Sequence, residues 1–298
     1  MPEAIEVIVN AGSGSVLAGE TERSLKQRFI AHGMRANVHL AAGGHEIERF
    51  AREAASGPAE IIVAGGGDGT ISSISRHVAL AGKVLGVLPL GTLNNFSKDL
   101  RIPQEVSGAV RTIATGVTRA VDLGEVNGRI FINNSSIGLY PRMVRHRVKE
   151  QRLGRGKWNA AFWASLRMFR VSPFLKVCIK LGDKEFLRKT PFVFVGNNEY
   201  EMDLYNIGRR VSISEGKLSL YFLHREGRWG VIMLLMKTVF GGLRQWRDFE
   251  AVSTDEITIQ TRRKRILVAF DGEIEKMESP LCYRTLPQAL KVIVPKEQ

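Results

Sequence analysis

A seven-residue glycine-rich segment constrains the fold of this 298-residue chain more than any other feature. The segment, Ala64-Gly65-Gly66-Gly67-Asp68-Gly69-Thr70, directly follows the apolar run Ile61-Ile62-Val63. A continuous apolar strand is typical of a parallel sheet covered on both faces, and the residues from Thr70 to Leu80 predict the helix that follows it. Glycines at such a turn let backbone N–H groups approach an anion, and the helix N-terminus adds its positive end. The segment therefore predicts a phosphate-binding loop; the alternative is a tight turn with only a structural role.

Asp68 is an unexpected residue in such a loop, because its carboxylate would repel a phosphate group. It must hold a cation or accept a hydrogen bond, which favours metal-linked phosphate over a bare anion. The loop is not a Walker A motif, since no Lys-Ser/Thr pair follows, and it does not match the dinucleotide fingerprint G-x-G-x-x-G. We expect Asp68 to organise magnesium or the phosphate contacts.

A second loop follows the next predicted strand, Val84 to Leu88, and reads Pro89-Leu90-Gly91-Thr92-Leu93-Asn94-Asn95-Phe96. Its Thr92, Asn94 and Asn95 side chains offer neutral hydrogen-bonding groups at the start of a helix. Since adjacent parallel strands place their carboxyl ends side by side, we expect both loops to form one ligand site. Simple N-capping by Thr92 or Asn94 is the alternative.

The order of predicted elements indicates two architectures in one chain. The first 120 residues alternate strands and helices, and a third glycine loop, Asn10 to Gly14, follows the first strand, although it could equally be only a turn. After about Asp122 the pattern changes to short strands, with a strong hairpin signal at Asn127-Gly128. Helical insertions are predicted near Lys157 to Phe169 and near Trp229 to Trp246. The chain therefore predicts an α/β domain with a parallel sheet, followed by a mostly-β domain.

Three motifs in this order resemble the diacylglycerol kinase catalytic family, which includes soluble bacterial lipid kinases and the sphingosine and ceramide kinases. They are Gly66-Gly67-Asp68-Gly69-Thr70, Gly91-Thr92-Leu93-Asn94-Asn95-Phe96 and Phe270-Asp271-Gly272-Glu273. The resemblance covers essentially the whole chain. It implies an α/β ATP-binding domain of residues 1–122, joined by a returning strand within 284–298, and a β-sandwich lipid-substrate domain of residues 123–283. NAD kinases share this two-domain plan.

The resemblance also assigns roles to individual residues. The nucleotide contacts are expected in the three glycine loops, and the full predicted set is Asn10, Gly12, Ser13, Gly14, Gly66, Gly67, Asp68, Gly69, Thr70, Ile71, Ser72, Thr92, Asn94 and Asn95. Glu273 matches the proton acceptor of the family, with Asp271 beside it. A carboxylate that deprotonates the attacking hydroxyl suits phosphoryl transfer. Which of the two carboxylates is the base stays open, and Asp271-Gly272 alone would suit an ordinary β-turn.

The resemblance implies a catalytic magnesium carried by ATP itself. Asp68 is predicted to organise it and Asp122 could help, although Asp122 suits a plain boundary residue equally well. Bacterial members usually also bind a structural magnesium through a segment of the type Asp-Asp-Gly-x-Leu-Asp. The matching stretch here, Ser214-Glu215-Gly216-Lys217-Leu218-Ser219, keeps one carboxylate, whereas hard divalent cations need several carboxylate oxygens. We therefore expect the structural site near Glu215 to be weak or absent.

The charge of the chain favours a polyanionic partner, because 43 Lys and Arg against 30 Asp and Glu give a formal net charge of +13. The segment from Arg142 to Arg170 joins basic residues to an aromatic-rich helical pattern, and Trp229 to Trp246 is similar. Both patterns suit an anionic membrane surface, with a solvated charge run and a core helix as the alternatives. No nucleic-acid-binding motif accompanies the basic residues, so we expect no nucleic-acid partner.

Together these features predict an ATP-dependent lipid kinase with ATP and Mg²⁺ as cofactors. A diacylglycerol-like lipid is the first candidate acceptor; ceramide, a sphingoid base and phosphatidylglycerol are others. The rival interpretations are an NAD kinase and a non-catalytic module that senses nucleotide or phospholipid. The start of the chain shows no secretory leader, and the longest apolar run is too short to span a bilayer. We expect a cytoplasmic protein attached peripherally to the inner face of the membrane, and the sequence allows a homodimer.

Overall fold

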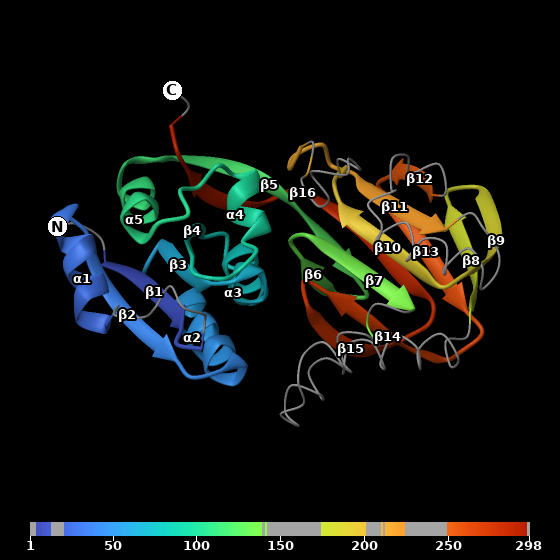
Figure 1. Cartoon of the computed structure of the whole chain (residues 1–298), viewed down its shortest axis with the longest axis horizontal. Coiled ribbons are helices and arrows are strands. Elements are labelled where there is room, and N and C mark those ends of the chain that lie inside the picture. Colours follow the sequence, from blue (N-terminus) through green and yellow to red (C-terminus); the bar gives the residue numbers. More distant parts are fainter. Residues whose placement is uncertain are drawn as a thin grey trace, which may run out of the picture.

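The computed structural model describes residues 4–12, 21–138, 141, 174–200, 210, 212–223 and 249–296. Ser13 and Gly14, the basic segment from Arg142 to Arg170 and the helical pattern from Trp229 to Trp246 lie outside these residues, so their predicted roles stay predictions. Figure 1 shows an α/β unit and a mostly-β unit joined by long strands, which confirms the predicted fold class. None of the described helices combines the length and apolar character needed to cross a bilayer.

The α/β unit contains a parallel sheet in the order β2-β1-β3-β4. Its strands are β1 (Ala4–Asn10), β2 (Arg35–Ala41), β3 (Ile61–Gly66) and β4 (Val84–Pro89). Its helices are α1 (Glu22–Ala31), α2 (Gly44–Ser56), α3 (Asp68–Leu80), α4 (Asn95–Asp99) and α5 (Val106–Thr115). Ile62, Val63 and Ala64 are completely buried, since helices cover both faces of β3, as the apolar run predicted.

The mostly-β unit consists of two sheet regions that share one buried apolar cluster. Six strands form one sheet in the order β12-β11-β10-β7-β14-β15. They are β7 (Asn134–Gly138), β10 (Phe192–Asn197), β11 (Leu218–Leu223), β12 (Phe249–Thr254), β14 (Arg265–Phe270) and β15 (Glu273–Glu278). The facing region contains β6 (Arg129–Phe131), β8 (Leu175–Leu181), β9 (Lys184–Thr190) and β13 (Glu256–Thr261). Ile137 from the first sheet and Ile259 from the second meet in the cluster, which is the arrangement of a β-sandwich.

Two long antiparallel strands, β5 (Val117–Val126) and β16 (Leu281–Val294), run from one unit into the other. Near its start β16 pairs with β13, and near its end Lys291 and Val292 pair in parallel with β4. The last strand therefore lies beside the first sheet. Because both strands contribute to both apolar cores, no break in the chain marks a boundary. The bounds 1–122 with 284–298, and 123–283, stay a prediction.

The predicted Asn-Gly hairpin is confirmed between β5 and β6. Asn127 and Gly128 have φ angles of 46° and 80°, the two positive values that the tightest hairpin turns require. The Asp271-Gly272 pair repeats this geometry between β14 and β15, with φ angles of 47° and 89°. The late acidic motif is therefore the tip of a hairpin.

Candidate active site

The first glycine loop connects the end of β3 to the start of α3. A Cβ atom on Gly66 would lie 2.5 Å from Cβ of Thr70, so only glycine fits where the chain turns back on the helix. Gly67 is the N-cap of α3, and no side chain caps the helix there. Among the described residues no side chain accepts from the first-turn N–H groups of α3, as an anion-binding helix N-terminus requires.

The three glycine loops meet at one edge of the parallel sheet, as the sequence predicted for the first two. A Cβ atom on Gly91 would lie 2.3 Å from Cα of Gly67, so the first and second loops touch through backbone alone. The third loop joins them through Asn10, whose Nδ2 donates to Oγ1 of Thr70 at 3.1 Å. The carbonyl oxygen of the same amide accepts from Gly12 N at 3.0 Å.

Asp68 is bound to the second loop. Its Oδ2 accepts the N–H of Asn95 at 3.1 Å, and its Oδ1 accepts that of Phe96 at 3.0 Å. These are first-turn amides of α4, so Asp68 caps that short helix from a different loop. The sequence predicts that the Asp68 carboxylate either holds a cation or accepts a hydrogen bond. In the structure it accepts hydrogen bonds.

Asn94 shapes the second loop from inside. The residue is buried and left-handed, with a φ of 52°. Its Oδ1 accepts from Gly91 N at 3.0 Å, and its Nδ2 donates to Gly91 O at 2.9 Å. Asn94 occupies the N-cap position of α4, but its side chain makes no capping hydrogen bond to that helix. The alternative of simple N-capping by the Asn94 side chain is therefore wrong. Thr92 is exposed on the same loop, where a ligand could reach its hydroxyl.

Asp271 connects the hairpin tip to the first glycine loop and is fully engaged in hydrogen bonds. Its buried carboxylate accepts from Oγ of Ser72 at 2.5 Å and from the backbone amides of Ile132, Asn133 and Asn134 at 2.7, 2.9 and 3.1 Å. Burial raises the pKa of this carboxyl, and the four hydrogen bonds act in the opposite direction. A Cβ atom on Gly69 would lie 3.5 Å from the carbonyl oxygen of Asp271. The structure thus brings the late acidic turn to the glycine loop.

Glu273 lies just beyond this turn, at the start of β15, and is exposed. Within the described part of the chain its carboxylate makes no hydrogen bond or ion pair, unlike that of Asp271. Surrounding protein atoms partly desolvate it and raise its pKa, and the charges of Glu48 and Asp271 act in the same direction. Arg129 and Arg76 oppose this shift. Of the two late carboxylates, Glu273 is the one with no hydrogen-bond donor among the described residues.

The neighbouring acidic group, Glu48 of α2, is held by α3. Its Oε1 accepts from Ser73 Oγ at 2.5 Å, and its Oε2 lies 2.8 Å from Nε2 of His77. Burial alone would raise the pKa of Glu48, but the hydrogen bonds from Ser73 and His77 outweigh it and lower the pKa. Glu48 therefore stays charged and adds a negative field beside Glu273.

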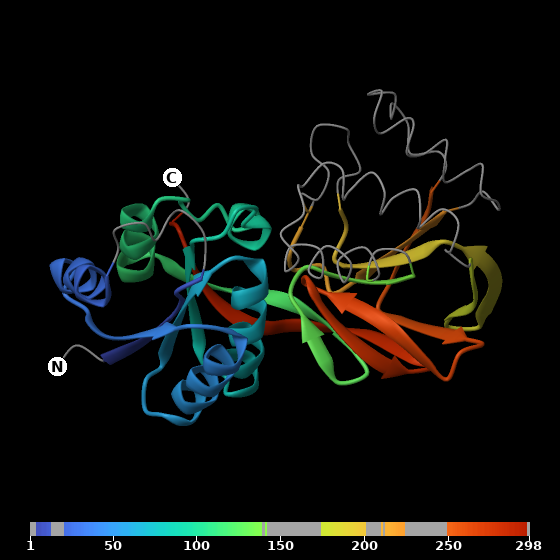
Figure 2. The same cartoon turned by 60° about the horizontal axis from the view of Figure 1, so that its bottom comes forward.

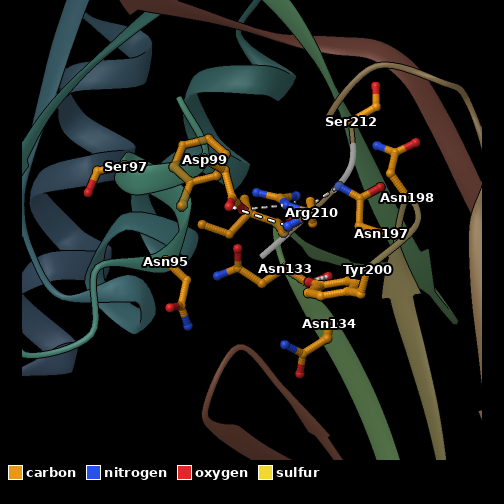
Figure 3. A network of polar contacts seen from close by, with 12 residues as sticks. Asn95, Ser97, Asp99, Asn133, Asn134, Asn197, Asn198, Tyr200, Arg210 and Ser212 are labelled. Carbon is orange, nitrogen blue, oxygen red and sulfur yellow. Dashed lines mark hydrogen bonds and ion pairs between the residues drawn. The ribbon is translucent and has the colours of Figure 1, made fainter. Parts of the chain in front are cut away.

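A buried ion pair at the junction of the two units is a feature that the sequence analysis missed (Figure 3). Nε of Arg210 lies 2.7 Å from Oδ2 of Asp99, and the two side chains are 1% and 5% exposed. Arg210 Nη1 also donates to the carbonyl oxygen of Ile132 at 2.8 Å. Burial raises the pKa of Asp99, and Arg210 counteracts this. The pair ties the end of α4 to the segment that binds Asp271. No local sequence motif predicts this ion pair, because Asp99 and Arg210 are 111 residues apart in the chain.

Asp122 has a structural environment of its own. It is 1% exposed, and its carboxylate accepts the N–H of Gly216 at 2.6 Å and that of Gln288 at 2.8 Å. Gln288 lies in the bulge where the register of β16 shifts between Leu286 and Leu290. Asp122 and Asp68 thus have separate partners.

A resident metal does not fit the described residues, which contain no group of three or more His, Cys, Asp or Glu side chains that could hold one. In the segment that would correspond to the structural site, the backbone N–H of Glu215 donates to Asn198 Oδ1 at 3.2 Å. The metal-binding roles of Asp68 and Asp122 stay predictions.

Residues 4–126 match the family model of the diacylglycerol kinase catalytic domain. Over 130 residues the chain is 35% identical to the diacylglycerol kinase of Bacillus subtilis, covering 43% of this chain and 43% of that protein. It is 41% identical over 108 residues to a protein of Pseudomonas syringae named "Probable lipid kinase YegS-like", covering 36% of this chain and 35% of that protein. These matches thus span less than half of each relative.

The fold resembles that of solved structures over nearly the whole chain. The crystal structure of a diacylglycerol kinase from Bacillus anthracis superposes with a TM-score of 0.69 at 19% identity, covering 98% of this chain and 97% of that one. At this identity the likeness shows the fold, including the mostly-β unit that the family model does not reach.

Proposed function

We propose that this protein is an ATP-dependent lipid kinase of the diacylglycerol kinase family, which phosphorylates the hydroxyl of a membrane lipid, most simply a diacylglycerol. One contact carries the proposal: Ser72, the fifth residue of α3, donates to Asp271 at the tip of the β14–β15 hairpin. It joins a helix N-terminus suited to phosphate to a turn that carries a free carboxylate.

The nucleotide side of the site consists of backbone donors. The amides of Gly67 to Thr70 have no acceptor among the described side chains, and together with the dipole of α3 they suit the phosphates of ATP. Thr92 offers an exposed hydroxyl on the adjoining loop, and Asn10 orients Thr70. Magnesium bound to the ATP phosphates would neutralise charge on the transferred group. Asp68 keeps the second loop against α3 and, on the family resemblance, would help to orient that ion.

The acceptor side assigns different tasks to the two late carboxylates. The oxygen of the lipid hydroxyl attacks the γ-phosphorus atom while Glu273 takes the proton of that hydroxyl. ADP leaves with the oxygen that bridged its β-phosphorus atom to the γ-phosphorus atom. Its raised pKa makes it a stronger base than an ordinary glutamate. Asp271, saturated by four donors, positions the hairpin. The lipid-kinase names of the relatives support this proposal over an NAD kinase, and the free Glu273 supports it over a non-catalytic module.

The proposal can be tested by incubating the full chain with ATP and a total lipid extract, and by identifying lipids that gain one phosphate in a mass spectrometer. Glu273→Gln should slow transfer by about 10²- to 10⁴-fold, the usual contribution of a general base. Glu275→Gln is the matched control, because Glu275 lies on the same face of β15 but is paired with Arg129 at 2.9 Å. Phosphorylation of added NAD with no phosphorylated lipid would contradict the proposal, and so would ATP binding without any transfer.

We also infer that the protein meets its acceptor at the anionic inner face of a membrane, attached peripherally from the cytoplasm. The formal net charge of +13 supports this attachment. Binding to vesicles should therefore weaken as salt rises and should require anionic lipid. Equal binding to purely zwitterionic vesicles would contradict this inference.

A further inference from the structure

One row of side chains crosses the outer face of the six-stranded sheet and contains a buried hydroxyl group. In register, Tyr221 of β11 pairs with Phe194 of β10, which pairs with Ser136 of β7. Ser136 also pairs with Ala269 of β14, and Ala269 pairs with Ile274 of β15. The next residue along β7, Ile137, points into the sandwich core, so Ser136 faces away from it. A single aliphatic hydroxyl thus lies in the middle of an otherwise apolar and aromatic row.

Within the described part of the chain this hydroxyl has no hydrogen-bond partner, although Ser136 is only 2% exposed. Two neighbouring hydroxyl groups do have partners. The hydroxyl of Tyr221 accepts the N–H of Tyr200 at 3.3 Å, and the hydroxyl of Ser135, on the opposite face of β7, lies 3.2 Å from that of Tyr283. A buried polar group without a partner is destabilising, because nothing replaces the hydrogen bonds that it made to water. A ligand atom that arrives from outside the chain could supply the missing acceptor.

The position of Ser136 relates it to the proposed site of phosphoryl transfer. Asn134 lies two residues earlier on the same face of β7, about 7 Å away at the rise of an extended strand. Two hydrogen bonds link Asn134 and Asp271: the N–H of Asn134 donates to the side-chain Oδ1 of Asp271, and the N–H of Asp271 donates to the carbonyl oxygen of Asn134. Figure 3 shows Asn134 beside the ring of Tyr200, at this end of the strand. Ser136 therefore lies one step along the sheet from the Asp271 turn.

We propose that Ser136 binds the acceptor lipid, by donating its hydroxyl to an uncharged oxygen next to the reacting hydroxyl, such as an ester carbonyl of a diacylglycerol. This inference rests on the proposed function and adds an acceptor subsite to it. The apolar neighbours Phe194 and Ala269 suit the first carbons of the acyl chain on either side of that oxygen. No described side chain in the row carries a positive charge, so the row favours a carbonyl over a phosphate.

The test compares two serines on opposite faces of one strand, in mixed micelles containing a short-chain diacylglycerol. Ser136→Ala should raise the KM for the lipid by about 3- to 10-fold, the equivalent of one ordinary hydrogen bond. It should leave the KM for ATP unchanged and should not lower Tm, because the hydroxyl it removes has no partner in the protein. Ser135→Ala removes the hydrogen-bond partner of the buried Tyr283 hydroxyl, so it should lower Tm. It should leave the KM for the lipid unchanged.

An ether-linked diacylglycerol analogue of the same chain length isolates the proposed contact. The wild type should prefer the ester over the ether, and Ser136→Ala should lose that preference. An unchanged preference, or an equal change in Ser135→Ala, would overturn the subsite.

A titration of the same lipids that needs no turnover separates this inference from the proposed function. If lipid binds and Ser136→Ala weakens binding, yet no phosphate is transferred, the kinase proposal fails and the subsite stands. If the wild type binds no uncharged lipid, or if the bulkier Ser136→Leu binds it as well as the wild type does, the subsite fails.

Discussion

Replacing Arg210 with methionine should destabilise the protein far more than removing an exposed arginine. Arg210 and Asp99 are almost fully buried, and their charged groups lie 2.7 Å apart. Breaking a buried pair by removing one partner leaves an uncompensated charge and costs about 3–5 kcal/mol. In a domain of 150–250 residues, 1 kcal/mol shifts Tm by about 2–4 °C, so we expect a decrease on the order of 10 °C.

The double variant Asp99→Leu with Arg210→Met gives the decisive comparison. Replacing a whole buried pair by apolar residues is often neutral or stabilising, so the double variant should recover most of the lost Tm. Arg284→Met is the control, because Arg284 pairs with Glu125 at 2.9 Å but is 57% exposed. Because solvent screens such a surface pair, this variant should keep nearly the Tm of the wild type.

The loss in Arg210→Met should also depend on pH. Burial raises the pKa of the Asp99 carboxyl, and Arg210 opposes that shift. Without Arg210, burial is the main influence on this pKa. A carboxyl with a raised folded-state pKa favours the folded protein when it is protonated, so stability falls as pH rises from its unfolded pKa through its folded pKa. The Tm deficit should therefore be smaller at pH 5 than at pH 8. A double variant as unstable as the single one, or an Arg210→Met variant no worse than Arg284→Met, would refute the reasoning.

Three further predictions concern the site. Because the pKa of Glu273 is raised from 4.5, the acidic limb of the pH profile of kcat/KM should lie above pH 4.5. Arg129→Gln removes a charge that lowers this pKa, so it should move the limb to higher pH. A limb that does not move would show that Glu273 is not the titrating base. Asp68→Ala should abolish transfer and also cost about 0.5–2 kcal/mol of stability, since it uncaps α4, whereas full activity would exclude the role assigned to it. Gly91→Ala should lower both Tm and ATP affinity, because its Cβ would lie 2.3 Å from the backbone of the first loop. Gly44→Ala, inside α2 and with no atom within 4 Å of the added Cβ, is the control that should lower neither.

The sequence predicts the parts of this molecule that depend on local physics. The apolar run Ile61-Ile62-Val63 specifies a buried strand, and Asn127-Gly128 specifies a tight hairpin, because each needs only its own residue types. The meeting of Gly67 with Gly91 follows from the parallel order of the strands. Even the approach of Asp271 to the glycine loop is expected from the family resemblance, although not from the residues alone.

The unpredicted features are contacts between segments that no pattern relates. Asp68 accepts from amides 27 and 28 residues away, which its position in a glycine loop does not reveal. The different surroundings of Asp271 and Glu273 are equally hidden in the sequence, since only the carboxylate of Asp271 is enclosed by described hydrogen-bond donors. In a chain with many basic residues, nothing in the sequence distinguishes the buried Arg210 from an arginine on the surface. Its burial becomes evident only from its ion pair with Asp99.

The two paired strands β5 and β16 limit how the halves of this protein can move and how they can be separated. A hydrogen-bonded ribbon can twist about its length but cannot swivel freely as a single flexible linker does. Any rearrangement of one unit against the other would therefore have to twist or bend both strands together. A single cut after the α/β helices would also remove the strand that covers β4, exposing a row of unpaired backbone groups that invites aggregation. The two halves of the molecule are joined by a shared sheet as well as by the chain.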